Sequence, residues 1–181
     1  MDQSVNRKNI GVCMAQLQAT IENLLQQYEG YFTITRPHCF AGNEIPAYAY
    51  FTQKIEKYIL VRRAQLYAIE TNEHVFIMDA KELTPAVWER EKQRLLQAEK
   101  DYVRPNRDHM CSFITLVLLC GSIDTGVQKE IQRLRYTKYY KAGIWGYSTV
   151  RVAAIDLTRE KFVLNRQAKV IRKVMERALR G

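Results

Sequence analysis

The sequence has few of the residues from which metal and nucleotide sites are built. Its three histidines, His38, His74 and His109, lie far apart, and none of its four cysteines forms a Cys-x-x-Cys pair. Protein metal sites usually show closely spaced ligands, so no metal site is expected. The stretch 121–126, GSIDTG, lacks the Gly-Lys-Ser/Thr ending of a phosphate-binding loop, and no Gly-x-Ser-x-Gly nucleophile motif occurs. The sequence therefore indicates neither a metal nor a cofactor.

Long hydrophobic runs are also missing. The longest, FITLVLLC at 113–120, is too short to span a bilayer. The first residues, MDQSVNRKNIG, have no apolar stretch after their charges, so no signal peptide is expected. Three cysteines, Cys13, Cys111 and Cys120, lie in or beside apolar runs, where thiols act as small hydrophobic side chains. These features predict a cytoplasmic protein without membrane insertion.

Positive charge is concentrated in the C-terminal part of the chain. The 181 residues are 47% hydrophobic and 26% charged, values typical of one globular domain spanning 1–181. Residues 1–105 carry 13 basic and 13 acidic side chains, whereas residues 106–181 carry 15 basic and 6 acidic ones, which accounts for the net charge of +9. Such a region attracts the phosphate backbones of nucleic acid or an anionic membrane surface. The alternative is a basic surface that only interacts with water.

The N-terminal half shows one helix followed by strands. Apolar residues at spacings of three and four between Ile10 and Tyr28 predict an amphipathic helix that ends at Gly30. This helix either packs on the protein's own sheet or pairs with a second copy. A further functional alternative is therefore a homo-oligomeric structural or interaction protein, such as a homodimer, that pairs through this helix or through an exposed tyrosine-rich hairpin. Strands are predicted at 31–35, 47–53, 58–70 and 74–78. The segment 36–46 is expected to be a loop, and turns are expected at 54–57 and 71–73, which makes the last three strands an antiparallel meander.

The C-terminal half alternates helices and strands. Thr84-Pro85 is typical of a helix start, and this helix is expected to end near Tyr102. The run 110–120 is apolar on both faces, as in the middle strand of a covered sheet. A short helix at 127–134, strands at 149–157 and 162–164, and a helix capped by Asn165 complete the chain. The predicted class is α+β, with helices packed on a mostly antiparallel sheet in the order α-β-(β-β-β)-α-β-α-β-β-α.

Aromatic and basic residues are interleaved between Glu130 and Asp156, an interval without an acid. Its cations are Arg133, Arg135, Lys138, Lys141 and Arg151, and its rings from 136 onward are Tyr136, Tyr139, Tyr140, Trp145 and Tyr147. Nucleic-acid bases stack on aromatic rings while cations neutralise phosphates. The alternative is that the same rings pack in a hairpin that turns at Gly146.

We therefore expect a binding domain without catalysis, whose partner is nucleic acid or another polyanion. The final helix adds further cations on its polar side. The predicted nucleic-acid-binding residues are Lys138, Lys141, Trp145, Tyr147, Arg151, Lys169, Arg172 and Lys173.

One stretch also resembles a known protein family. The pattern Tyr140-Lys141-x-Gly143-x-x-Gly146-x-Ser148-x-x-Arg151, followed by an apolar strand that ends in Asp156-Leu157, is similar to one in a family of uncharacterised bacterial proteins of unknown function. The resemblance lies in the C-terminal half. It implies a shared fold and a bacterial origin, and it implies no activity.

An enzyme is the second hypothesis. Glu70 at the end of one predicted strand and Asp79-Ala80-Lys81 at the end of the next resemble the acid and acid-x-Lys elements of restriction-endonuclease-like, Mg²⁺-dependent nucleases. Carboxylates there hold Mg²⁺, and the lysine lies near the attacking water. Antiparallel pairing would separate Glu70 from Asp79 by about 16 Å, which disfavours this hypothesis.

Overall fold

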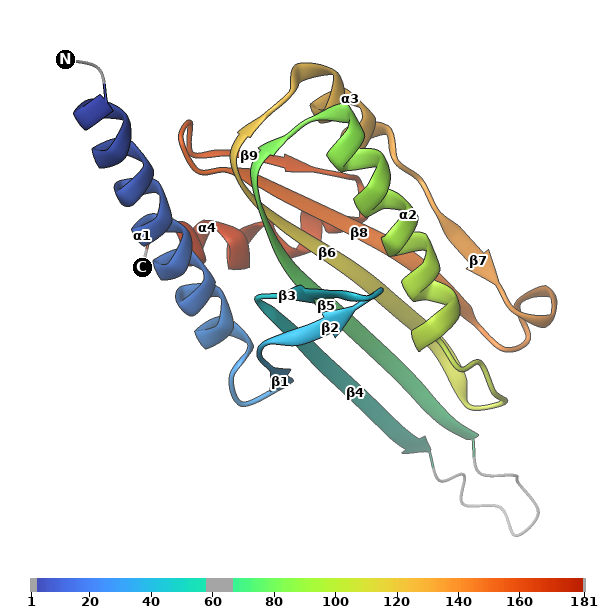
Figure 1. The fold of residues 1–181 in the computed structure, drawn as a ribbon. Helices are drawn as coiled ribbons and strands as arrows, with labels where there is room; N and C mark the ends of the chain where they lie inside the picture. Colours follow the sequence, from blue (N-terminus) through green and yellow to red (C-terminus); the bar gives the residue numbers. More distant parts are fainter. Residues whose placement is uncertain (1–2, 58–66, 181) are drawn as a thin grey trace, which may run out of the picture.

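Long strands form the centre of the structure. The computed structural model describes residues 3–57 and 67–180. The α-helices in these ranges are α1 (Gln3–Tyr28), α2 (Pro85–Tyr102), α3 (Thr125–Arg133) and α4 (Arg172–Arg180), with short 3₁₀ helices η1 (Lys141–Gly143) and η2 (Gln167–Ile171). The strands are β1 (Thr33–Thr35), β2 (His38–Phe40), β3 (Asn43–Ile45), β4 (Ala47–Lys57), β5 (Tyr67–Leu83), β6 (His109–Ile123), β7 (Thr137–Tyr139), β8 (Tyr147–Asp156) and β9 (Lys161–Leu164) (Figure 1).

Seven of the described strands form a mixed sheet in the order β1-β4-β5-β6-β8-β7, with β9 also paired to β8, and β2 and β3 form a separate two-stranded sheet. The central strands β5, β6 and β8 are parallel, while the outer pairings are antiparallel. Parallel neighbours require crossover connections, and α2 and α3 lie in these connections. The α+β class, with helices packed on a mixed sheet, is confirmed, and the parallel centre is a feature that the predicted meander did not include.

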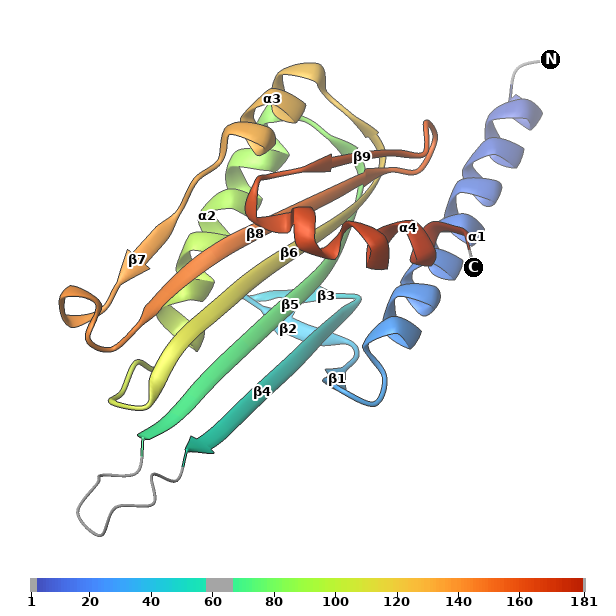
Figure 2. The ribbon, with the colours of Figure 1, turned by 180° about the vertical axis from the view of Figure 1, so that it is seen from behind.

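Helices cover both faces of the sheet. One face packs against α1, η2 and α4 through residues such as Leu24, Val117 and Met175. The other face packs against α2, α3 and the β2–β3 hairpin, and Phe76 and Trp88 are fully buried there (Figures 1 and 2). Residues 114–120 of β6 are therefore buried on both sides, as predicted for the run 110–120, whereas Met110 at its start is 51% exposed. Within residues 3–57 and 67–180, no helix is both long and apolar enough to cross a membrane.

The expected turns at 54–57 and 71–73 are wrong. Strands β4 and β5 continue through them as one long antiparallel pair, in which Thr52 faces Asn72. The polar residues at 71–73 remain in the strand because they find partners there. Asn72 accepts a hydrogen bond from Tyr50 and donates one to Glu70. Residues 58–66 of the strand predicted at 58–70 lie outside the described residues.

The segment 36–46, which was expected to be a loop, contains the β2–β3 hairpin. Its turn uses positive backbone φ angles at Ala41 and Gly42. The hairpin closes over the core, and the Phe40 ring stacks on Phe76 with centroids 4.2 Å apart. Burial of an aromatic ring gives this short hairpin a stabilising contact that turn residues alone do not reveal.

Several local signals are confirmed. Thr84 caps α2 by accepting a hydrogen bond from the Val87 N–H, and α2 ends at Tyr102. Asn165 accepts one from the Ala168 N–H at the start of the C-terminal helical segment, which begins as η2. Gly146 turns the β7–β8 hairpin with φ of +70°.

Candidate functional site

The outer edge of β8 is shared by two short strands. Strand β7 pairs with residues 147–149 of β8, and β9 pairs with residues 153–156. Between them, the Asn165 side chain replaces a strand partner, since its Oδ1 accepts from the Val152 N–H at 3.0 Å and its Nδ2 donates to the Val150 carbonyl at 3.1 Å. Asn165 is completely buried. The chain segments that enter β7 and leave β9 therefore part from the sheet at this junction.

A positively charged cleft of about 400 Å³ lies where these segments part. It is lined by Gln132, Arg135, Phe162, Leu164, Arg166, Lys169 and Arg172. Four of these side chains are cations, and none of the described lining residues is acidic. Like charges gathered in one concave site raise the local concentration of anions.

Carboxylates compensate little of this charge. Arg172 Nε lies 2.8 Å from Glu176 Oε1, and both side chains are partly exposed. In the described part of the chain, no carboxylate forms an ion pair with Arg135, Arg166 or Lys169. Arg135 instead donates to the backbone carbonyls of Gln132 and Leu134, near the C-terminus of α3. These bonds position its guanidinium and leave its charge available to an anion.

Three of the cleft cations follow one another at a spacing of three. Arg166, Lys169 and Arg172 flank or belong to η2, and residues three apart align on one side of a 3₁₀ helix. Of these three, the predicted binding residues included Lys169 and Arg172. Arg166 and Arg135 were missed as binding residues, although the spacing of three was a readable signal for Arg166.

Lys173 lies apart from this cleft. It lines a second depression between α1 and α4, of about 520 Å³, together with Gln27, Glu176, Arg177 and Arg180. This depression has three cations and one acid. The predicted cations at 169–173 are therefore divided between two sites.

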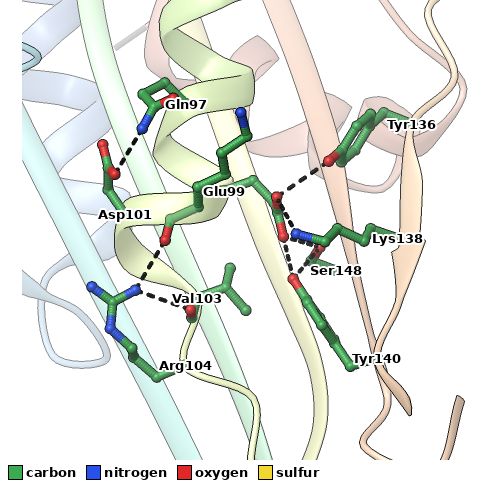
Figure 3. Close-up of polar contacts among 10 residues, drawn as sticks. Gln97, Glu99, Asp101, Val103, Arg104, Tyr136, Lys138, Tyr140 and Ser148 are labelled. Carbon is green, nitrogen blue, oxygen red and sulfur yellow. Dashed lines mark hydrogen bonds and ion pairs between the residues drawn. The ribbon is translucent and has the colours of Figure 1, made fainter. Parts of the chain in front are cut away.

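Lys138 belongs to a buried cluster around Glu99 on the opposite side of the sheet edge (Figure 3). The Glu99 side chain is 1% exposed, and Lys138 Nζ lies 3.1 Å from its Oε2. Tyr136 also donates to Oε2, while Tyr140 and Ser148 donate to Oε1. The structure thus places Lys138 against a carboxylate that matches its charge.

Hydrogen bonding keeps Glu99 ionised. Burial acts to raise the pKa of Glu99, but hydrogen bonds from Tyr140, Lys138 and Ser148 outweigh it and lower the pKa below the usual glutamate value. Burial, followed by the hydrogen bond to Glu99, raises the pKa of Tyr140, so this hydroxyl stays protonated as a donor. The cluster has its hydrogen bonds satisfied, which fits a structural role in joining α2 to β7 and β8.

Arg151 is likewise matched to a carboxylate. Its NH1 lies 2.7 Å from Glu73 Oε1, and its side chain is 10% exposed. The guanidinium lies over the Phe113 ring, 3.6 Å from the centroid, and Thr115 donates to the same Glu73 oxygen. Arg151 therefore joins β8 to β5 across the sheet and presents little charge to a polyanion in solution.

The aromatic residues of the 136–147 stretch separate into two groups. Tyr136 and Tyr140 direct their hydroxyls to Glu99, and Lys141 covers the Trp145 ring at 3.7 Å from the centroid. Tyr139 is 67% exposed, and its ring centroid lies 6.0 Å from that of the half-buried Tyr147. Of the five rings, Tyr139 is the exposed one, while Tyr136, Tyr140, Trp145 and Tyr147 are partly buried.

The residues of the nuclease hypothesis are not brought together. Glu70, Asp79 and Lys81 all lie on β5, so the expectation of two successive strands is wrong. Nine strand steps place Glu70 and Asp79 about 30 Å apart. Glu70 instead accepts hydrogen bonds from Asn72 and Asn106. No group of three metal-ligating side chains occurs among the residues that the structure describes.

Comparison with protein-family models identifies a family for the chain. A family model described as "Domain of unknown function (DUF8052)" matches residues 16–177, from α1 to α4. The match extends well beyond the C-terminal half that carries the resemblance noted in the sequence. It confirms a family of unknown function, while a bacterial origin stays a prediction. No curated protein and no solved structure matches the chain.

Proposed function

The chain belongs to the DUF8052 family of domains of unknown function, and from its geometry we propose that it binds the phosphate backbone of nucleic acid through the cleft between β7 and β9. The observation that carries this proposal is the cleft lining, in which Arg135, Arg166, Lys169 and Arg172 are not accompanied by an acid among the described residues. Binding requires no catalytic group. The proposed place of action is the cytoplasm.

The extent of the positive charge favours a polymeric anion over a small one. Beyond the cleft, α4 carries Lys173, Arg177 and Arg180 around the second depression. A nucleic acid lying along α4 would contact cations at both sites, and each phosphate contact adds affinity by releasing counterions. This arrangement supports binding that weakens steeply as the salt concentration rises.

Fluorescence anisotropy with labelled oligonucleotides tests the proposal. The variant Arg166→Gln/Lys169→Gln removes two charges from the cleft. The matched control, Lys81→Gln/Arg107→Gln, removes two exposed charges elsewhere. We expect the cleft variant to lose affinity on the order of tenfold at low salt, and the control variant to change it less than twofold. Equal losses in the two variants would assign binding to net charge and overturn the cleft as the site.

A further inference from the structure

Part of one sheet face has no described helix over it. On the face that α1 and α4 cover, Val117 and Ala153 are fully buried. Two residues earlier in β6 and β8, Thr115 and Arg151 lie on the same face as Val117 and Ala153. Another two residues earlier, this face carries Phe113 and Thr149. Figure 2 shows the ribbons of β5, β6 and β8 uncovered by the described helices in this region. Thr115, Thr149 and Arg151 are buried by neighbouring side chains, whereas Phe113 and Tyr147 are partly exposed and Tyr139 is exposed. We call the surface formed by Phe113, Tyr147 and Tyr139 the open face.

The open face continues directly from the cationic cleft. Arg135 precedes β7 and lines the cleft, while Thr137 and Tyr139 are two residues apart in β7, so their side chains lie on one side of the sheet. Contacts to β8 confirm this side: Thr137 Oγ1 donates to Thr149 Oγ1 at 3.3 Å, and the Tyr139 and Tyr147 rings are neighbours. Arg135 and Tyr139 are four residues apart, which is at most about 13 Å of extended chain. A bound strand that enters the cleft therefore reaches the rings within a few nucleotides.

We propose that the nucleic acid is single-stranded, with phosphates in the cleft and bases stacked on Tyr139 and Tyr147. This inference rests on the proposed function and names its substrate class. Tyr139 is the exposed ring of the hairpin, and neither its hydroxyl nor its ring is used by the Glu99 cluster. In a duplex the bases stack on each other and offer no face to a tyrosine. Unpaired bases do offer one, and stacking contributes about 1–3 kcal/mol per base with little dependence on base identity.

Alternatives for the open face are a second copy of this chain and water alone. The cations that adjoin it favour a negatively charged occupant over another copy of a chain whose net charge is +9. The buried Arg151–Glu73 pair is neutral overall, so it leaves the cleft as the dominant charge beside the rings. The positive charge of the cleft and the exposure of the Tyr139 ring thus both favour nucleic acid as the occupant of the open face.

The test compares a labelled single-stranded oligonucleotide with its duplex, using wild type, Tyr139→Leu, Tyr139→Phe and the control Tyr31→Leu. Tyr31 is 79% exposed in another part of the molecule. We expect tighter binding of the single strand and a loss of about fivefold or more in Tyr139→Leu. Tyr139→Phe should retain the affinity because it keeps the ring, and Tyr31→Leu should leave it unchanged.

The outcomes separate the two proposals. If neither oligonucleotide binds, the proposed function fails and this inference fails with it. If both bind equally and Tyr139→Leu has no effect, the cleft proposal survives and the single-strand inference is overturned. Light scattering on the same samples that shows a dimer lost in Tyr139→Leu would assign the open face to a second copy, which also overturns the inference.

Discussion

Gly146 holds the ring-bearing hairpin against the start of β6. Its backbone φ is +70°, and a Cβ at this position would lie 2.1 Å from the Met110 carbonyl oxygen and 2.7 Å from that of His109. The neighbouring Trp145 carbonyl lies 2.7 Å from His109 Nδ1, so the residue before the glycine is also held against the start of β6. We predict that Gly146→Ala moves this turn and strongly destabilises the fold.

The size of the effect follows from two contributions. An alanine with positive φ costs about 1–2 kcal/mol, and displacing a packed backbone costs about 1–3 kcal/mol more. The matched control is Gly143→Ala, because Gly143 has φ of +91° but no atom within 4 Å of a Cβ. Urea denaturation should therefore show a loss of about 1–2 kcal/mol for Gly143→Ala and about 3 kcal/mol or more for Gly146→Ala.

Similar losses in the two alanine variants would refute this reasoning. They would mean that the hairpin does not rest on the His109 and Met110 carbonyls. The positions of Tyr139 and Tyr147 beside the cleft would then lose their structural basis. A loss in Gly146→Ala that exceeds the control would confirm both the turn and the placement of the rings.

Two further substitutions test the polar interior. Glu99→Gln should lower the free energy of unfolding by about 2–3 kcal/mol, since it removes the charge that four donors share, whereas exposed Glu89→Gln should leave it close to wild type. Folding lowers the pKa of Glu99, so the stability that its charge contributes is fully present above the unfolded glutamate pKa of about 4.3. This stability is lost as the pH falls through the lower folded pKa. The difference in unfolding free energy between wild type and Glu99→Gln should therefore shrink below about pH 4. If the difference between wild type and Glu99→Gln grew as the pH fell, this would contradict an ionised Glu99 in the folded protein. Asn165→Ala should cost about 3 kcal/mol or more in urea denaturation because it leaves buried groups of Val150 and Val152 unpaired, and a neutral result would show that the gap between β7 and β9 is closed in another way.

The features that the sequence predicted well are those with local causes. The Thr84-Pro85 helix start depends on a cap and a fixed backbone angle within a few residues. The doubly buried centre of β6 follows from one continuous apolar run, and the β7–β8 turn follows from Gly146. In each case the physical cause and the structure it produces lie in the same short segment.

The features that it missed depend on partners far away in the chain. Glu73 looked like part of a turn because its partner, Arg151, lies 78 residues later on a different strand. Lys138 and Arg151 were expected to be available to a polyanion, and Lys138 instead meets Glu99, which lies 39 residues earlier. The cleft itself arises where β7 and β9 divide the edge of β8, and no short stretch of sequence contains that junction.

The salt dependence of single-strand affinity is the most direct test of phosphate binding in the cleft. Each phosphate contact to a single strand contributes about 0.7 to the slope of log K against log salt concentration. Arg166→Gln/Lys169→Gln should therefore reduce the slope by about 1.4 relative to wild type, and Lys81→Gln/Arg107→Gln should leave it unchanged. Parallel lines for wild type and the cleft variant would mean that Arg166 and Lys169 contact no phosphate.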